Sequence, residues 1–358
     1  MTYTPAPKTR LFAPYDPSTG TYRVRMDANE SFLLPTDEDR QRMAQAAAEV
    51  ALNRYPDPTA GALCGAFASL YGVDPALVTA GNGSDELISL ILSAFLQKGE
   101  TVLTLTPDFS MYSFYTAITE TPCVSMNKEP DGRIDVDRVL ATAKMVGARM
   151  IIFSNPCNPT SLGLSADETR RLIRGTDALV VLDEAYMDFW DQSLLGEAAE
   201  YDNLIVLRTC SKAIGLAALR LGFAVANPAL TGVLRAAKSP YNVNAVTQEM
   251  ARIVLENRVY HEVYPGLLIE SRRQLVNGLK VLERDYPFHV YDSVTNFAFV
   301  EVDGAKALYE RLADAGILVR CLGERNLRIT AGTQSENAEL VASLRFLMEE
   351  RAKGTAKE

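Results

Sequence analysis

The sequence predicts a three-layer α/β protein with a mostly parallel central sheet, followed by a second, smaller α+β domain. Short apolar runs recur between amphipathic segments, as in TVLTLT at 101–106 and NLIVLRT at 203–209. Continuous runs of this kind are typical of strands that helices bury on both faces. The chain has 358 residues, 47% of them hydrophobic and 23% charged, which is enough material for two globular domains.

The first two thirds of the chain carry the elements of the larger domain. Amphipathic patterns with turn residues at their ends predict helices over residues 38–52 and 60–71, and a third that opens with GNGSDE at 81–86 and runs to about residue 97. The apolar runs predict strands over residues 101–106, 149–154, 178–184, 203–209 and 221–226. We therefore expect a large domain over residues 46–240 whose sheet lies between two layers of helices.

The pattern changes after residue 246. One long helix is expected over 247–285, bent at Pro265, because apolar residues recur there at helical spacing. The remaining elements are predicted in the order strand 296–302, helix 305–315, strands 316–320 and 326–330, and a last helix from about Glu336. These form a small domain over residues 241–358, and residues 1–45 are expected to pack with it.

Composition and charge exclude several classes of protein. The formal net charge of −9 disfavours a nucleic-acid-binding surface. The N-terminal residues lack the apolar core of a signal peptide, and the longest apolar run, residues 87–96, is half the length that a bilayer requires. A cytoplasmic protein without a membrane partner is therefore expected. The five cysteines are scattered and form no CxxC pair, so neither a metal site nor a disulfide framework is predicted.

Histidine is nearly absent from the chain. Its two histidines, His261 and His289, lie far from any Ser, Cys or carboxylate cluster in the sequence. A Ser-His-Asp hydrolase or a histidine-ligated metal site is therefore disfavoured. If the protein performs acid–base chemistry, a residue of another type must carry the proton.

Polar residues follow several of the predicted strands, where ligands of open α/β sheets bind. After ALVVL comes Asp183, which could be a Walker B acid, a plain turn cap, or a buried carboxylate that pairs with a cationic nitrogen. The Walker B interpretation requires a GxxxxGK[ST] motif, which the chain lacks. After NLIVLRT come Ser211 and Lys212, with Arg220 eight residues beyond the lysine. A lysine held near other cations has a lowered pKa and can form a Schiff base.

Two further motifs are ambiguous on their own. The segment GNGSDE at 81–86 is a weak dinucleotide signal without its third glycine, but it suits an anion-binding helix N-terminus or a simple helix cap. The segment NPCNPT at 155–160 contains two Asn-Pro steps, which make a rigid turn that either aims an amide into the crevice or braces the loop.

Taken together, the motifs resemble the fold-type I, class II pyridoxal 5′-phosphate (PLP) aminotransferases, and most closely their histidinol-phosphate aminotransferase branch. The resemblance covers nearly the whole chain, through the ordered segments DANES, RYPD, GNGSDE, PDFSMY, NPCNPT, LDEAY, SKAIGLAALRLG, YNVN and LRITAGT. It implies a ping-pong transamination of histidinol phosphate with 2-oxoglutarate, which yields glutamate and serves histidine biosynthesis.

The resemblance also implies roles for individual residues. Lys212 would form the Schiff base with the cofactor and act as the base, Asp183 would pair with the ring nitrogen, and Tyr186 would complete the catalytic set. The residues expected to bind the cofactor are Tyr55, Gly83, Ser84, Asp85, Phe109, Asn158, Asp183, Tyr186, Ser211, Lys212 and Arg220. Phe109 would stack on the ring, and Tyr55 would reach the cofactor phosphate from a partner subunit, so that a homodimer shares its active sites.

Substrate recognition is expected from Tyr15, Asn29, Arg320 and Arg328. A guanidinium group binds either a carboxylate or a phosphate, so one site could serve both half-reactions. Ser161 and Ala218 stand where glycines are common in the family, and the connection between the two arginines is short. A threonine-phosphate decarboxylase and an aromatic amino acid aminotransferase share most of these motifs and remain alternatives.

Overall fold

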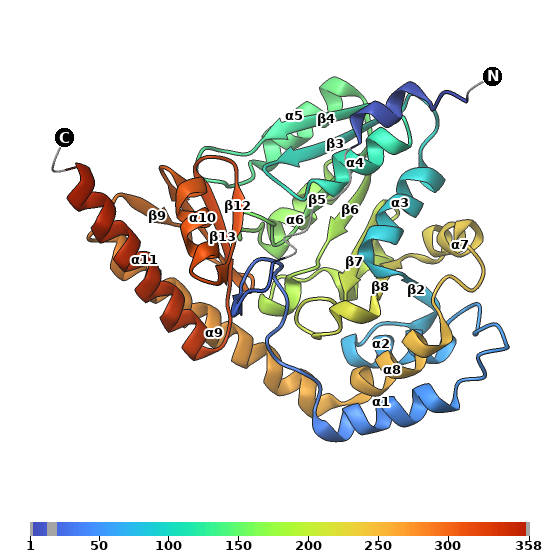
Figure 1. Cartoon of the computed structure of the whole chain (residues 1–358). Coiled ribbons are helices and arrows are strands. Elements are labelled where there is room, and N and C mark those ends of the chain that lie inside the picture. Colours follow the sequence, from blue (N-terminus) through green and yellow to red (C-terminus); the bar gives the residue numbers. More distant parts are fainter. Residues whose placement is uncertain (1–2, 13–19, 356–358) are drawn as a thin grey trace.

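A seven-stranded sheet forms the centre of the computed structural model, which describes residues 3–12 and 20–355 (Figure 1). Its spatial order is β2-β8-β7-β6-β5-β3-β4. The strands are β2 (Val78–Gly81), β3 (Thr101–Thr106), β4 (Cys123–Asn127), β5 (Ala148–Ser154), β6 (Leu179–Asp183), β7 (Leu204–Thr209) and β8 (Gly222–Ala226).

β8 is antiparallel to both of its neighbours, whereas the other pairs of adjacent strands are parallel. The carboxyl ends of the parallel strands therefore meet at one edge of the sheet. Because β8 runs the opposite way, it begins at that same edge, two residues after Arg220.

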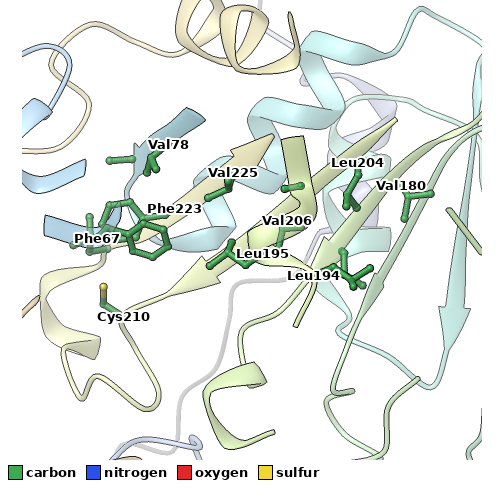
Figure 2. Close-up of a cluster of buried hydrophobic side chains, with 14 of the residues drawn as sticks. Phe67, Val78, Val180, Leu194, Leu195, Leu204, Val206, Cys210, Phe223 and Val225 are labelled. Carbon is green, nitrogen blue, oxygen red and sulfur yellow. The ribbon is translucent and has the colours of Figure 1, made fainter. Parts of the chain in front are cut away.

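Helices cover both faces of this sheet (Figure 1). The helices of this part of the molecule are α1 (Asp37–Glu49), α2 (Gly61–Tyr71), α3 (Gly83–Phe95), α4 (Met111–Ile118), α5 (Val136–Val146), α6 (Ala166–Arg174), α7 (Pro228–Ala237) and α8 (Ala245–Glu256). Of these, α1 packs against α8, which packs against α2. Side chains alternate between the faces along each strand: Val180 and Leu182 belong to one hydrophobic cluster and Val181 to another. In the first cluster the ring of Phe67 stacks on that of Phe223 at 4.1 Å (Figure 2).

A second hydrophobic core belongs to the C-terminal part of the chain. Its elements are α9 (Arg258–Glu283), β9 (Phe288–Val290), β10 (Phe297–Val302), α10 (Ala305–Asp314), β11 (Ile317–Leu318), β12 (Arg320–Leu322), β13 (Asn326–Thr330) and α11 (Gln334–Thr355). β12, β13, β10 and β9 form an antiparallel sheet, and the long helices α9 and α11 pack against each other beside it (Figure 1).

The N-terminal part of the chain contacts both cores. β1 (Val24–Arg25) pairs in parallel with β11, so that Val24 and Met26 join the core of the C-terminal part. The 3-10 helix η1 (Pro7–Leu11) lies beside α4, where the ring of Phe12 packs edge-on against Phe114 at 5.3 Å. The remaining 3-10 helices lie in connections: η2 (Pro75–Leu77), η3 (Met187–Phe189), η4 (Leu195–Glu200) and η5 (Ala217–Leu219).

The predicted fold class is confirmed, with differences in individual elements. The single helix expected over 247–285 is wrong, because the chain breaks at Asn257, whose side chain accepts a hydrogen bond from the N–H of Tyr260 and caps α9. Pro265 lies inside α9. The strand expected over 316–320 is divided between β11 and β12, which belong to different sheets.

The domain boundaries inferred at residues 45 and 240 remain predictions. Within residues 3–12 and 20–355, no helix combines the length and the apolar character needed to cross a membrane.

Candidate active site

The carboxyl ends of three neighbouring parallel strands place the predicted polar residues together. β5 leads into the NPCNPT loop, β6 ends at Asp183, and β7 leads into the segment that carries Ser211 and Lys212. The segments that follow these strands begin at adjacent strand ends, so the register of the sheet brings their first residues together. This is the position at which open α/β sheets bind their ligands.

Asp183 is a buried carboxylate with two neutral hydrogen-bond donors. The hydroxyl group of Tyr112 donates to Oδ2 at 2.8 Å, and the N–H of Ala185 donates to Oδ1 at 3.1 Å. Burial raises the pKa of Asp183 to about 7, although both of these hydrogen bonds lower it. A cationic nitrogen beside this carboxylate would therefore be strongly stabilised.

Lys212 has the electrostatic surroundings of a reactive amine. Its Nζ donates to the carbonyl oxygen of Ala28 at 2.9 Å and lies 5.9 Å from the centre of the Tyr186 ring. Burial, with a further contribution from the positive charge of Arg328, lowers the pKa of Lys212 to about 8. Such a lysine holds far more unprotonated amine near neutral pH than an ordinary lysine does, as a nucleophile or a base requires.

Tyr186 and Asn29 join three distant segments of the chain. The side-chain amide of Asn29 donates to the hydroxyl oxygen of Tyr186 at 2.9 Å, and the hydroxyl of Thr330 donates to Oδ1 of Asn29 at 3.1 Å. Both Asn29 and Tyr186 are buried, and burial raises the pKa of the tyrosine. Asn29 therefore lies next to Tyr186, where it fixes that hydroxyl group.

Asn158 and Arg328 form a contact between the two parts of the molecule. Nη1 of Arg328, on β13, donates to Oδ1 of Asn158 at 2.6 Å, and Nη2 donates to the carbonyl oxygen of Asp27 at 2.6 Å. The guanidinium group also lies 5.7 Å from the centre of the Phe297 ring. These contacts hold Arg328 over the carboxyl ends of the central strands.

The start of α3 and the start of β8 form a second cluster. Gly83 has a positive φ of 77°, and its Cα lies so close to Arg220 that a Cβ there would be 3.0 Å from Nη2 of the arginine. Nη2 of Arg220 contacts Oδ2 of Asp85 at 3.3 Å, and Nη1 contacts the hydroxyl of Ser211 at 3.4 Å. Ser84 occupies the first turn of α3 beside them. A guanidinium group at a helix N-terminus is well suited to a phosphate.

Gly222 makes this cluster possible. A Cβ at Gly222 would lie 2.5 Å from the backbone nitrogen of Ser84 and 2.6 Å from the carbonyl carbon of Gly83. Only glycine permits β8 to approach the first turn of α3 this closely.

The remaining predicted residues lie at different distances from this centre. Phe109 is half-buried and packs edge-on against Tyr112 at 5.6 Å. Arg320 pairs directly with Arg328 across β12 and β13. Tyr55 is 81% exposed and stacks on Tyr241 at 4.6 Å. Tyr15 lies outside the described residues.

Sequence reasoning missed Tyr112 and Gly222. Tyr112 lies in α4 rather than at a strand end, and its contact with Asp183 depends on how that helix packs. From the sequence, Gly222 is only one residue of a predicted apolar strand. The signal that could have drawn attention to Gly222 is a glycine at the start of a strand that follows two cationic residues.

The residues present fit an anionic cofactor with a basic ring nitrogen. The Arg220 cluster can hold a phosphate, the carboxylate of Asp183 can pair with a ring cation, and Lys212 can bond to an aldehyde. The buried Asp183 carboxyl, whose pKa is raised to about 7, is the observation that favours a cationic partner most directly.

Comparisons with known proteins agree with this description. Residues 23–344 match the family model "Aminotransferase class I and II". The histidinol-phosphate aminotransferase of Clostridium novyi is 37% identical over 92% of this chain and 93% of that protein. Its counterpart in Pyrococcus furiosus is 32% identical over 95% and 96%.

Solved structures share the fold over nearly the whole chain. The histidinol-phosphate aminotransferase of Sinorhizobium meliloti, solved in complex with pyridoxal-5′-phosphate, matches with a TM-score of 0.88 and 24% identity, covering 98% of this chain and 99% of that one. The L-threonine-O-3-phosphate decarboxylase of Porphyromonas gingivalis matches with a TM-score of 0.77 and 24% identity, covering 91% and 99%. The resemblance seen in the sequence is thus confirmed, and the chain belongs to the class I and II aminotransferases, which use pyridoxal phosphate as their cofactor.

Proposed function

We propose that this enzyme transfers an amino group between histidinol phosphate and 2-oxoglutarate, in the cytoplasmic biosynthesis of histidine. The curated relatives named histidinol-phosphate aminotransferase, at 32–37% identity over more than nine tenths of the chain, support this substrate. The geometric observation that carries the proposal is the pairing of Arg320 with Arg328 across β12 and β13. Residues directly opposite in antiparallel strands project from the same face of the sheet, so the two cations stand side by side, and the charge of Arg328 acts on Lys212.

The two arginines suit substrates with two separated anionic or polar ends. Arg328 lies over the strand ends, held by Asn158 and the backbone of Asp27, and is placed to bind a carboxylate close to the reacting carbon. Arg320 is one strand further out and is placed to bind a more distant phosphate or the side-chain carboxylate of glutamate. Since guanidinium groups bind both kinds of anion, one pair of residues can serve both half-reactions.

Lys212 is the proposed base. When bound, pyridoxal phosphate supplies a cationic ring that stabilises negative charge on the substrate carbon. Nζ of Lys212, whose pKa is lowered to about 8, would accept the proton that leaves this carbon and would donate it back in the reverse direction of transfer. Asp183 would stabilise the ring cation, and Tyr186, fixed by Asn29, would hydrogen-bond the ring oxygen together with Asn158. A protein with two histidines thereby performs acid–base chemistry.

The cofactor phosphate is assigned to Gly83, Ser84, Asp85, Ser211 and Arg220, at the N-terminus of α3. Phe109 is assigned to the ring face. Tyr55 is assigned to the cofactor phosphate that the partner subunit binds, in a homodimer in which each active site contains residues of both subunits. Its exposure and its stacking on Tyr241 support that assignment, because a large exposed aromatic pair favours a protein interface.

The test is the visible absorbance of the purified protein with its cofactor. We expect the cofactor band to be lost when L-histidinol phosphate is added and to return when 2-oxoglutarate follows. A Lys212→Ala variant should retain the fold but show no turnover. A band that ignores histidinol phosphate would contradict the substrate, and release of carbon dioxide from threonine phosphate would identify the decarboxylase instead.

Arg320→Gln separates the two anion positions. This variant should raise KM for histidinol phosphate about tenfold or more, because a charged hydrogen bond contributes roughly 1.5–3 kcal/mol. Lys306→Gln, which changes a charge on the neighbouring helix α10, is the matched control and should leave KM unchanged. Equal KM values for wild type and Arg320→Gln would remove Arg320 from the substrate site.

A further inference from the structure

Lys128 is a buried lysine that the proposed mechanism does not use. It directly follows β4, and its side chain is 0% exposed. Its Nζ lies 2.7 Å from Sγ of Cys157 and 3.4 Å from Oδ2 of Asp108. Lysines are almost never fully buried unless they are paired, so an ammonium group at this place requires an explanation.

Both partners of Lys128 immediately precede residues of the candidate site. Asp108 comes before Phe109 and accepts a hydrogen bond from its backbone N–H at 2.8 Å. Cys157 comes before Asn158, in the loop after β5. Lys128 thus connects the segment proposed to hold the cofactor ring face with the segment that contacts Arg328.

Asp108 carries a negative charge into the neighbourhood of Asp183. Its carboxylate is buried, and besides Lys128 it contacts the backbone N–H and the hydroxyl group of Ser154. The charge of Asp108 raises the pKa of Asp183, and a higher pKa opposes the ionised form that would pair with a cationic ring. A positive charge beside Asp108 offsets this effect.

We propose that Lys128 is a positioning residue of the cofactor site: its ammonium group neutralises Asp108 and fixes the segments that carry Phe109 and Asn158. This inference rests on the roles proposed above for Asp183, Phe109 and Asn158. A purely structural ion pair would affect only the stability of the fold. A lysine that balances the charge of Asp108 would also affect the pH at which the groups of the site titrate.

The test follows the pH midpoint of the cofactor absorbance in the holoenzyme without substrate. Removing a positive charge raises the pKa of every nearby group, and removing a negative charge lowers it. The groups that face the titrating centre are Tyr112, Asp108 and Asp85 around Asp183, and Arg328, Glu30, Arg220 and Asp85 around Lys212. Asp108 is the member of this set that Lys128 contacts, so a change at Lys128 acts on the centre through Asp108.

Lys128→Met should move the midpoint to higher pH, by up to about one unit. Asp108→Asn should move it to lower pH, and Lys128→Met combined with Asp108→Asn should return it close to the wild-type value. Lys144→Met, the same substitution at an exposed lysine on α5, is the matched control and should leave the midpoint in place. Thermal unfolding of each variant reports its folding separately.

Opposite shifts for the two single variants, with restoration in the double variant, would establish the role. Unchanged midpoints in folded single variants, or a double variant that titrates like Lys128→Met, would overturn it. If Lys128→Met does not fold, the direction in which Asp108→Asn moves the pH midpoint of the cofactor absorbance is the deciding result, because that variant retains the lysine. The measurement needs no substrate, so an enzyme that fails to act on histidinol phosphate still gives a readable result.

Discussion

The hydroxyl group of Tyr112 donates a 2.8 Å hydrogen bond to Oδ2 of Asp183, and both side chains are buried. This bond lowers the pKa of the carboxyl group, opposing the effect of burial. We expect Tyr112→Phe to raise the pKa of Asp183 and to move the acid limb of the kcat–pH profile to higher pH. At pH 7 kcat should fall about tenfold, since a hydrogen bond to a charged group contributes roughly 1.5–3 kcal/mol. An unchanged acid limb would show that this bond does not tune the carboxylate.

The stability of the cofactor-free enzyme should depend on pH through Asp183. Its pKa is raised from 3.8 to about 7 by burial, so between these values the folded protein holds a proton that the unfolded chain has released. Stability conferred by that proton is therefore lost as the pH rises from about 4 to about 7, by roughly 3–4 kcal/mol. Urea unfolding of wild type and Asp183→Asn across this range measures the difference, which should grow with pH in favour of the variant. If the unfolding free energies of the two proteins changed with pH in parallel, the assignment of this pH dependence to Asp183 would be contradicted.

Gly222→Ala should weaken cofactor binding without altering a charged group. The new methyl group would lie 2.5 Å from the backbone nitrogen of Ser84, so the first turn of α3 must move away from β8. We expect a loss of stability of about 1–3 kcal/mol and an affinity for pyridoxal phosphate reduced at least tenfold, measured by fluorescence titration.

Gly232→Ala is the matched control for this experiment. Gly232 lies inside α7, where a Cβ would meet no atom within 4 Å. Alanine there should preserve cofactor affinity and leave the stability equal or higher by up to about 1 kcal/mol. Similar losses in both variants would attribute the effect to something other than the close approach at Ser84.

Arg208 forms ion pairs with two residues of the segment that carries Tyr186. Its side chain is 5% exposed, and it contacts Asp188 at 2.7 Å and Glu184 at 3.1 Å, on either side of Tyr186. Arg208→Met would leave the fully buried carboxylate of Glu184 and the largely buried one of Asp188 without their cation and should destabilise the protein by about 3–5 kcal/mol. Arg252→Met removes partly exposed pairs with Glu249 and Glu256 and should change stability by less than about 1 kcal/mol in the same denaturation assay. Equal effects would refute a special role for the buried network.

The sequence was informative where the chemistry follows a strand. β5, β6 and β7 are continuous apolar runs, and the residues after them lie together because the carboxyl ends of parallel strands share an edge. There is a physical reason why the sequence does not predict β2 and β4. β2 has only four residues, including alanine and glycine, and β4 is a partly exposed strand at the margin of the sheet. Neither contains the apolar run by which the other strands were recognised.

Contacts made by packing were beyond the sequence. Lys128 and Tyr112 look like ordinary residues in their local patterns, and only the approach of α4 and β4 to the ends of β5 and β6 gives them their partners. The break at Asn257 had a local signal, an asparagine before a new helical turn, but apolar periodicity on both sides obscured it. The roles assigned to the site residues await the experiments above.

The reversed direction of β8 has a consequence for how the enzyme can be altered. β7 ends at the site and β8 begins there, and the two strands are hydrogen-bonded to each other. Lys212 and Arg220 therefore lie in the single loop that connects β7 with β8. The spacing between the proposed reactive amine of Lys212 and the proposed phosphate-binding cation of Arg220 therefore depends on one contiguous segment, and insertions elsewhere in the chain do not change it. Such a stretch could be exchanged between relatives as one unit, whereas Arg320 and Arg328, the arginines proposed to bind substrate, lie in another part of the chain and could diversify independently.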